Sequence, residues 1–396
     1  MDFYDILFAK SQNKGGGGGG GESLRPIVER TANVISDSSA SFVGSYAFYY
    51  YPIEATFSFP NVTKVMSDAF LQVTGNFNMP NLTEVQRNGF RRVVASNFNF
   101  PKLVSAGDSS FEMCNGVSNI NFPMLETLGL AAFSNVSTLV SASMPSLKTI
   151  GRSAFLSCAS LQTVYMPSVT SVPNYCFQSD VSLSQINIDN CTSIGNYAFG
   201  YCYSLSSISA PNVEDIAGGA FFRAGLISAY FPKALTVASS AFSTCSSLVR
   251  IDCPLVTSIN SFVALSNLRE INFPNATGGC QACFSACYSL QEADFPKMVS
   301  LPQSAFYKCS SLSVVRLSVC TWLGFSAFYM CSSLMSVYLG SYVSMPMSAF
   351  VGTPMVNSTY TGTFGSIFVP ESLYSTYLSN SYWSSLWDRF VSVSAI

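Results

Sequence analysis

Three cysteines that lie close together in the sequence are the residues best placed for metal or redox chemistry. Cys280, Cys283 and Cys287 form a Cys-x-x-Cys motif followed by a third thiol four residues later. This spacing could begin a zinc site, with Cys253 or Cys309 as a fourth ligand. The alternative is that they are small buried side chains, because reduced cysteine behaves as a small hydrophobic residue. We favour this second interpretation and expect no metal and no cofactor.

Four carboxylates, Asp252, Glu270, Glu292 and Asp294, are the other groups that could do chemistry. The chain contains no histidine, which excludes Ser-His-Asp and Cys-His catalysis and histidine-ligated zinc. A glycosidase needs two carboxyl groups about 5 to 9.5 Å apart in a cleft, and the flat sheet predicted below offers no cleft. Calcium ligation, a binding patch and a solvated acidic surface remain as alternatives. We therefore expect no enzymatic activity.

The elements that position these residues repeat along the chain. The stretch Ser146–Pro167 contains an Ala-Phe pair, Ala154 and Phe155, followed by Cys158 and Leu161. The same residue types recur about every 22 residues, and a period of about 20 to 29 residues is typical of a leucine-rich-repeat solenoid. The column aromatic, meaning the residue at the Phe155 position of each repeat, falls at Phe48, Phe70, Phe90, Phe111, Phe133, Phe155, Phe177, Phe199, Phe221, Phe242, Phe262, Phe284, Phe306, Phe328 and Phe350.

Short strands are predicted directly before the proline that ends each repeat. In the stretch above, Val164 and Met166 point inward, Tyr165 between them points outward, and Pro167 follows. This alternation indicates a half-buried strand, and proline suits its end because it has no N–H to donate. We predict a leucine-rich-repeat solenoid of about 15 repeats of about 22 residues. It would have short parallel strands, turns or short helical segments on the convex side, and capped ends.

One repeated motif resembles a known family. The pattern Ser-Ala-Phe-x-x-Cys-x-Ser-Leu occurs at residues 153–161, 240–248, 304–312 and 326–334. It resembles the BspA-type leucine-rich repeats of bacterial surface proteins and of some protozoa and viruses, and the resemblance covers about residues 45 to 369. It implies adhesion and recognition and transfers no catalytic residue to this chain.

The segments outside the repeats suggest a tether and two ends. The prefix with its seven glycines is similar to leaders of virion proteins from phages that infect gut bacteria. After the repeats, Pro370 and Glu371 suit a helix start. Trp383, Trp387 and Phe390 then supply an aromatic patch. The predicted segments are an amphipathic prefix (1–14), a polyglycine linker (15–21), an N-terminal entry segment or cap (22–44), the repeats (45–369) and a C-terminal helical and aromatic cap (370–396).

Composition excludes several classes of partner. Only 10% of the residues are charged and the net charge is −2, whereas nucleic-acid binding needs clustered Lys and Arg. No apolar run approaches the length of a membrane span, and the start MDFYDILFAK does not have the form of a secretory signal. We expect an extracellular, cell-surface or virion location. Most of the 13 cysteines recur three residues after the column aromatic, which favours reduced thiols in the core.

The outward positions of the predicted strands are the candidate binding surface. Amide, hydroxyl and tyrosine side chains suit recognition of a cell-surface protein or glycan, and residues 1–21 could attach the chain to other virion proteins. The alternatives are a structural or decoration subunit of a virion and a bacterial surface adhesin. Asn-x-Ser/Thr sequons at Asn61, Asn81, Asn135, Asn190, Asn275 and Asn357 are interpreted as part of the repeat rather than as glycosylation sites. The candidate ligand-binding residues are Asn99, Asn121, Tyr165, Asn187, Tyr230, Arg250, Asp252, Glu270, Asn272, Glu292, Asp294, Arg316 and Tyr338.

Overall fold

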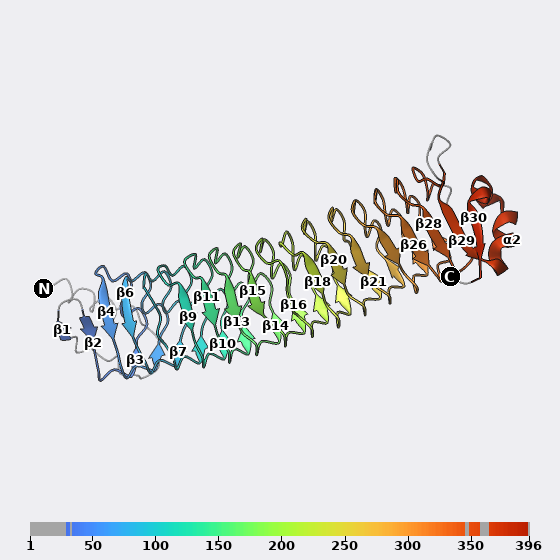
Figure 1. The fold of residues 1–396 in the computed structure, drawn as a ribbon. Coiled ribbons are helices and arrows are strands. Elements are labelled where there is room, and N and C mark those ends of the chain that lie inside the picture. The colour runs from blue at the N-terminus through green and yellow to red at the C-terminus, as the bar shows by residue number, and fades with distance from the viewer. Residues whose placement is uncertain (1–28, 32–33, 345–347, 357–363, 395–396) are drawn as a thin grey trace, which may run out of the picture. The chain divides into compact units, whose positions relative to one another are not determined.

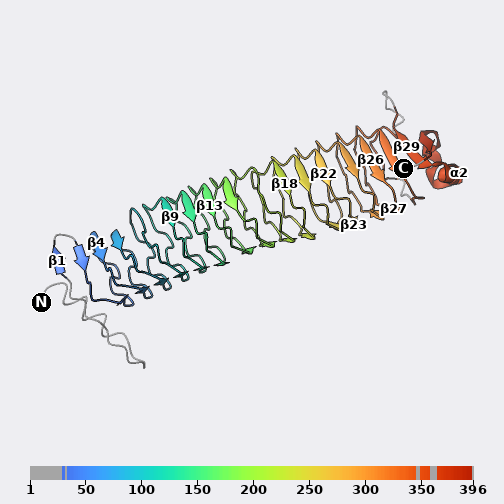
Figure 2. The same ribbon diagram turned by 60° about the horizontal axis from the view of Figure 1, so that its bottom comes forward.

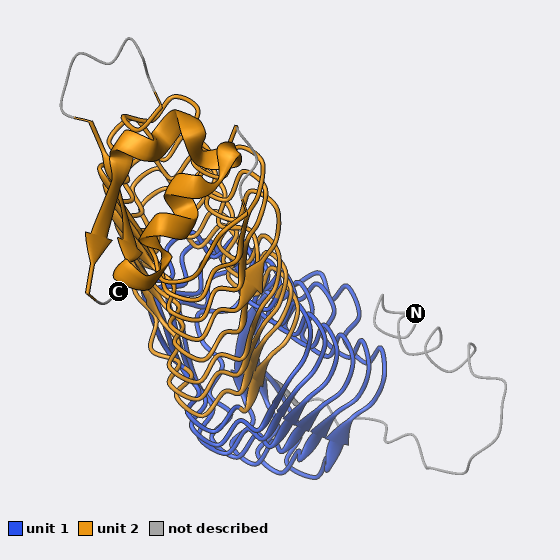
Figure 3. Cartoon of the chain, turned by 90° about the vertical axis from the view of Figure 1, so that its right-hand side faces the viewer, with its two compact units in different colours: residues 1–169, 176–187 blue, residues 170–175, 188–396 orange. Residues whose placement is uncertain are grey.

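A computed structural model describes residues 29–31, 34–344, 348–356 and 364–394 (Figure 1). The predicted prefix and polyglycine linker, and residues 22–28 and 32–33 of the predicted N-terminal entry segment, lie outside the described residues. The chain divides into two compact units (Figure 3). Unit 1 comprises residues 1–169 and 176–187, and unit 2 comprises residues 170–175 and 188–396. In each unit parallel strands stack as a solenoid, so the predicted fold class is confirmed.

Each turn of the solenoid typically contributes one longer strand and one two-residue strand in unit 1. The longer strands have the predicted alternation, as in β4, where Ala55 and Phe57 are buried and Thr56 and Ser58 face outward. From β2 onward, parallel pairing holds them in register about 22 residues apart, whereas β1 pairs antiparallel with β2. The longer strands are β1 (Glu29–Thr31), β2 (Val34–Ser36), β4 (Ala55–Ser58), β6 (Gly75–Asn78), β9 (Asn119–Asn121), β11 (Ser141–Ser143), β13 (Thr163–Tyr165) and β15 (Gln185–Asn187). The short strands are β3 (Phe42–Val43), β5 (Lys64–Val65), β7 (Glu84–Val85), β8 (Ser105–Ala106), β10 (Thr127–Leu128) and β12 (Thr149–Ile150).

Unit 2 repeats this arrangement, with β18, β22, β26 and β29 along one side and β23 and β27 along another (Figure 2). Its longer strands are β18 (Ser228–Tyr230), β20 (Arg250–Asp252), β22 (Glu270–Asn272), β24 (Glu292–Asp294), β26 (Val314–Leu317), β28 (Ser336–Leu339), β29 (Ser366–Pro370) and β30 (Phe390–Val393). Its short strands are β14 (Ser171–Val172), β16 (Ser193–Ile194), β17 (Asp215–Ile216), β19 (Thr236–Val237), β21 (Ser258–Ile259), β23 (Gly278–Gly279), β25 (Ser300–Leu301) and β27 (Trp322–Leu323).

The Ala-Phe pair lies in a tight turn rather than in a helical segment. Around Phe133, Ala131 and Asn135 have φ values of 53° and 60°. Left-handed residues two positions before and after the aromatic interrupt a right-handed helix, which explains why the described repeats form turns instead. The N–H groups of these three residues donate to carbonyl oxygens 21 positions later, at 2.9, 2.7 and 2.7 Å. Neighbouring turns are therefore joined by backbone hydrogen bonds just as the strands are.

The column aromatics form the centre of the core. Phe155 is fully buried and stacks between Phe133 and Phe177, with ring centroids 5.4 Å away on both sides and ring planes within 7° of parallel. In unit 2, Phe306 lies in the same way between Phe284 and Phe328, at 5.5 and 5.8 Å. Each ring thus depends on its neighbours for burial, which is why a single repeat does not stand alone.

The last described segment of unit 2 packs an α-helix and a 3-10 helix against the end of the sheet. Helix α2 (Glu371–Ser379) begins directly after Pro370, as the sequence predicts, and η1 (Ser381–Arg389) leads into β30. The Tyr377 hydroxyl accepts the N–H of Val343 at 2.9 Å and donates to the Ser341 carbonyl at 2.7 Å. Trp383 is fully buried, but Trp387 is 43% exposed and does not join the packed aromatic patch.

Candidate functional site

The outward side chains of the longer strands form rows across neighbouring repeats, and we call this surface the strand face. In unit 1 the parallel register places Asn121, Ser143, Tyr165 and Asn187 in one row. Asn121 and Tyr165 are exposed, and Asn187 is half-buried. Asn99 is exposed and bridges back to Asn78 of the preceding repeat. The unit 1 candidates are therefore neutral amide and phenol groups.

In unit 2 the strand face carries charge. One row contains Tyr230, Asp252 and Asn272, and the row beside it contains Arg250 and Glu270. Tyr230 is 57% exposed, so its ring is available to a partner. The structure therefore brings five predicted site residues onto three adjacent strands.

Asp252 is the exception to the predicted exposure. Only 8% of this residue is exposed, because its carboxylate accepts from Arg250 Nη2 at 3.3 Å and from Asn272 Nδ2 at 2.8 Å. Arg250 also donates through Nη1 to Glu270 Oε2 at 2.8 Å. The Arg250–Glu270 pair is exposed, and such pairs contribute at most about 1 kcal/mol to stability. Their effect here is to hold the Arg250 guanidinium in place on the strand face.

A second group lies on the sheet that ends with β30. The register aligns Asp294, Arg316, Tyr338 and Phe368 in one row. Arg316 donates to Glu292 at 3.2 Å, and its guanidinium carbon lies 5.3 Å from the centre of the Tyr338 ring, within cation–π range. Tyr338 stacks on Phe368 with centroids 4.5 Å apart. Sequence reasoning missed Phe368, although the alternation through Ile367, Phe368 and Val369 marks it as outward.

Glu270 and Glu292 each pair with a different arginine, Arg250 and Arg316, instead of with each other. Within the described ranges, no three His, Cys, Asp or Glu side chains gather into a group that could hold a metal ion. Those carboxylates therefore act in the described structure as partners of arginine.

The recurring cysteines form a buried column that bonds successive repeats together. Their thiols donate to the carbonyl oxygen of the column aromatic in the preceding repeat. The methyl group of alanine could not make this hydrogen bond. Burial raises the pKa of Cys245, Cys287 and Cys331 to about 12, which makes them poor nucleophiles. The bonds are Cys114 to Phe90 (2.9 Å), Cys158 to Phe133 (3.0 Å), Cys245 to Phe221 (2.9 Å), Cys287 to Phe262 (3.2 Å), Cys309 to Phe284 (3.0 Å) and Cys331 to Phe306 (3.0 Å).

The candidate Cys-x-x-Cys motif belongs to this packing. Cys283 and Cys287 are buried in the core, as the interpretation of small buried side chains predicts, and Cys280 is half-buried. Burial raises the pKa of all three thiols, with Cys287 reaching about 12. Thiols with raised pKa values are mostly protonated near neutral pH, and this disfavours a redox role for the motif.

Three of the sequon asparagines also bond successive repeats. Asn61, Asn81 and Asn275 donate through Nδ2 to the carbonyl oxygens of Ser38, Pro60 and Pro254, at 2.7 to 2.8 Å. Nδ2 is the atom to which a glycan would be attached, so these side chains are used by the fold. Asn357 lies outside the described residues.

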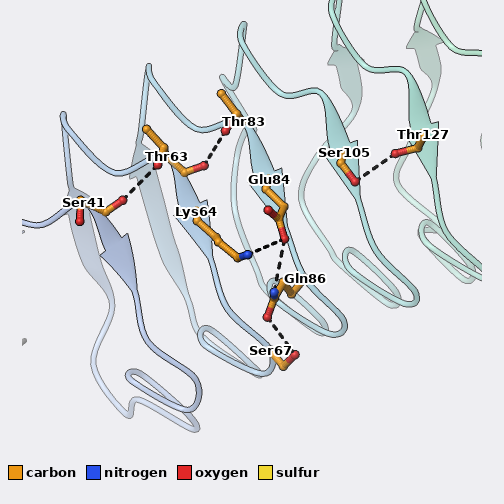
Figure 4. A network of polar contacts seen from close by, with 9 residues as sticks. All are labelled: Ser41, Thr63, Lys64, Ser67, Thr83, Glu84, Gln86, Ser105 and Thr127. Carbon is orange, nitrogen blue, oxygen red and sulfur yellow. Dashed lines mark hydrogen bonds and ion pairs between the residues drawn. The ribbon is translucent and has the colours of Figure 1, made fainter. Parts of the chain in front are cut away.

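The short-strand sheet of unit 1 has an outer surface that is largely satisfied by its own contacts (Figure 4). Lys64 pairs with Glu84 at 3.0 Å, and Glu84 also accepts from Gln86 at 3.3 Å. Thr83 donates to the Thr63 carbonyl at 2.9 Å. These groups lie within two neighbouring repeats, and none of them is aromatic, unlike Tyr165 in the row on the strand face.

Comparison with known proteins identifies the repeat. The family model "BspA type Leucine rich repeat region (6 copies)" matches residues 41–162, 126–249, 170–278 and 258–368. The fold is similar to the crystal structure of a leucine-rich repeat protein from Bacteroides ovatus, with a TM-score of 0.63 and 17% identity over 80% of this chain and 93% of that one. A leucine rich cell surface protein from Faecalibacterium prausnitzii matches with a TM-score of 0.37 and 19% identity over 92% and 98%. No curated protein sequence matches the chain.

The family matches together run without a gap from residue 41 to residue 368. They cover the column aromatics from Phe48 to Phe350 and the predicted repeat region almost completely. The chain therefore belongs to the family of BspA-type leucine-rich repeat proteins.

Proposed function

We propose that the chain is a non-enzymatic recognition or adhesion protein that binds a cell-surface protein or glycan through its strand face. The observation that carries this proposal is the exposed Tyr230 ring together with the Arg250 and Arg316 guanidinium groups, which lie in two groups on the strand face of unit 2. Tyr230 is an exposed aromatic, and both guanidinium groups are held in place by carboxylates on the same face. Aromatic and arginine side chains dominate the binding energy of protein interfaces.

Prior ordering of these side chains supports binding. A guanidinium that is already oriented loses less rotamer entropy when a partner arrives than a freely moving one. The Tyr338 ring is fixed in the same way between Arg316 and Phe368. In unit 1, the neutral row with Asn121, Tyr165 and Asn187 offers hydrogen-bonding groups of its own. An extracellular or cell-surface location follows from this proposal.

Binding of the fluorescently labelled full-length chain to gut bacterial cells and to epithelial cells tests the proposal. We expect saturable binding that Tyr230→Ala and Arg316→Ala each weaken at least about tenfold, which is about 1.4 kcal/mol. Tyr288→Ala is the matched control, because Tyr288 is 46% exposed but lies in a turn outside the strand face. Absence of binding from folded protein, or equal binding by all three variants, would overturn the proposal.

One observation favours a second function, that of a structural or decoration subunit. Many outward groups already have partners in the same chain, as Arg250 has in Glu270, and such contacts would stiffen a spacer. In that case Tyr165→Ala and Asn187→Ala would leave function unchanged.

A virion host-attachment component is a narrower form of the first proposal. It depends on residues 1–21, and deletion of that segment should then abolish incorporation into particles without affecting cell binding.

None of the helices in the described part of the chain has the length and apolar character needed to cross a bilayer. A bacterial surface adhesin is a second narrower form of the first proposal. Comparison of whole cells with culture medium by immunoblotting would test this form.

A further inference from the structure

A cluster of aromatic side chains in unit 2 lies in the turns around the column aromatics and not on the strand face. We call it the aromatic turn cluster, and it consists of Tyr197, Tyr201, Tyr203, Phe222 and Arg223. The Phe222 ring lies 5.8 Å from Tyr197 and 5.3 Å from Tyr201, both edge to face. Tyr203 lies 6.3 Å from Tyr201, also edge to face. The cluster thus joins side chains from two successive repeats.

Two glycines shape this cluster. Gly219 has a φ of +65°, and a Cβ added there would lie 2.8 Å from carbons of the Tyr197 ring. A Cβ at Gly225 would lie 1.9 Å from the Tyr203 carbonyl oxygen. Any side chain at Gly219 would push the Tyr197 ring away, and any side chain at Gly225 would separate the two backbones. Both residues are therefore required for the close arrangement of these rings.

Arg223 places a positive charge at the edge of the cluster. Its guanidinium carbon lies 5.6 Å from the centre of the Phe222 ring and 5.9 Å from that of Tyr201, within cation–π range. Arg223 is exposed, and within the described residues it forms no ion pair, whereas Arg250 and Arg316 do. The rings orient this guanidinium, and no carboxylate in the described part of the chain pairs with it.

We propose that the aromatic turn cluster binds a sugar that carries a carboxylate, such as a uronic or a sialic acid. A guanidinium can donate two parallel hydrogen bonds to one carboxylate. The C–H groups of a sugar ring are slightly positive and pack on the negative faces of aromatic rings. Tyr203 is 54% exposed and lies edge to face with Tyr201, the ring that Arg223 also approaches, so it would supply that surface.

The composition of the cluster favours this ligand over others. A single cation beside several rings fits one carboxylate on a ring-shaped ligand, whereas nucleic acid would need several cations to neutralise its phosphates. A neutral sugar would leave the Arg223 charge unused. An acidic peptide shares the carboxylate but has no apolar ring face to pack on Tyr203.

The related turn at Tyr307 and Lys308 provides a comparison within the same unit. Tyr307 stacks on Tyr329 at 5.0 Å, and Lys308 Nζ lies 5.4 Å from the Tyr307 ring centre. An ammonium is a point charge and cannot form the planar two-bond contact of a guanidinium. We therefore expect this turn to contribute little to recognition of the carboxylated sugar.

Calorimetric titration of the full chain tests the proposal, with trigalacturonic acid and 3′-sialyllactose as the acidic probes and lactose as the neutral one. We expect at least one acidic probe to bind and lactose to bind at least about tenfold more weakly. Arg223→Ala should weaken binding of that probe at least about tenfold, and Tyr203→Ala should also weaken it. Arg223→Lys should retain only part of the affinity. Preference for one acidic probe over the other would distinguish a uronate from a sialate site, and either result supports the proposal.

The controls separate this site from the strand face. Tyr288→Ala replaces a tyrosine that follows Cys287 as Tyr203 follows Cys202, and it should leave the affinity unchanged, as should Tyr230→Ala on the strand face. Loss of sugar binding in Tyr230→Ala with retention in Arg223→Ala would overturn this proposal and leave the strand-face function standing. Equal affinity for lactose, or binding only of a glutamate-rich peptide or of single-stranded RNA, would also overturn it. Thermal unfolding of each variant establishes that the variant is folded.

Discussion

Replacing Asp180 by asparagine should alter how the stability of the protein depends on pH. Asp180 lies three residues after Phe177, where the neighbouring repeat has Cys158, and it is fully buried in unit 1. Its Oδ1 accepts the N–H of Cys158 at 2.7 Å, while its Oδ2 has no hydrogen-bond partner among the described residues. Burial raises the pKa of this carboxyl well above its ordinary value, and the hydrogen bond from Cys158 opposes that rise only in part.

The sign of the effect follows from the raised pKa. In the unfolded chain the carboxyl ionises near its ordinary pKa of about 3.9, whereas in the folded protein it keeps its proton to a higher pH. Its contribution to stability is therefore complete below the ordinary pKa and is lost as the pH rises toward the folded-state pKa. The loss is about 1.4 kcal/mol per pH unit over that window. Asparagine does not ionise but still accepts the N–H of Cys158, so Asp180→Asn removes this loss.

Urea unfolding of the two proteins at about pH 4.5 and about pH 7 would measure the change. The buried amide of the variant adds a cost of about 1 to 3 kcal/mol, but this cost is the same at both pH values. We expect the variant to gain stability relative to the native chain as the pH rises. Asp108→Asn is the matched control, because Asp108 Oδ1 accepts the N–H of Leu130 at 2.8 Å but is exposed. A stability difference that is equal at both pH values, or an equal gain in the control, would refute the reasoning.

Three further predictions concern the core, the thiols and the C-terminal segment. Phe155→Ala should lower the free energy of unfolding by about 3 to 5 kcal/mol in urea titrations, because the stacked ring is fully buried. Ser209→Ala, at an exposed position, should change the free energy of unfolding by less than about 0.5 kcal/mol. Equal losses in the two variants would mean that the inward positions are misassigned. A thiol reagent should modify the native protein first at Cys280, as mass spectrometry of peptides would show, and faster labelling of any buried cysteine would contradict this. Tyr377→Phe should cost about 1 to 3 kcal/mol and speed hydrogen exchange at the Val343 amide; unchanged exchange there would mean that the hydroxyl does not hold the last strands.

The repeating features of the fold were predictable from the sequence. A residue type that returns at a fixed interval, such as Phe155 or Pro167, can satisfy the same backbone geometry in every turn. Its position in one repeat therefore predicts its position in all of them. The parallel register, the outward position of Tyr165 and the burial of Cys287 all follow from this periodicity. The segment boundaries and the ligand-binding roles proposed for the strand face stay predictions.

The features that break the repeat were not predictable, because they depend on contacts between particular side chains. Asp252 stands at an outward position, yet Arg250 and Asn272 fold over it and remove it from solvent. Tyr197 of the aromatic turn cluster lies at a position that is usually filled by a small or polar residue. The signal of the cluster in the sequence is the tyrosine-rich run from Asn196 to Ser204 followed by Gly219. The contact between Tyr197 and Gly219 becomes visible only once the turns are stacked.

The constant register between neighbouring strands has a consequence for how such a chain can change over time. Thr163, Val164 and Tyr165 pair with residues 22 positions later, and no strand in that sheet is displaced along its neighbour. Duplication of one 22-residue segment within unit 1 would therefore insert a turn whose two sides match its neighbours. The sheet would lengthen by about 4.8 Å without any change to the other rows. The length of the solenoid can therefore change by whole turns, while the contacts within each turn stay the same.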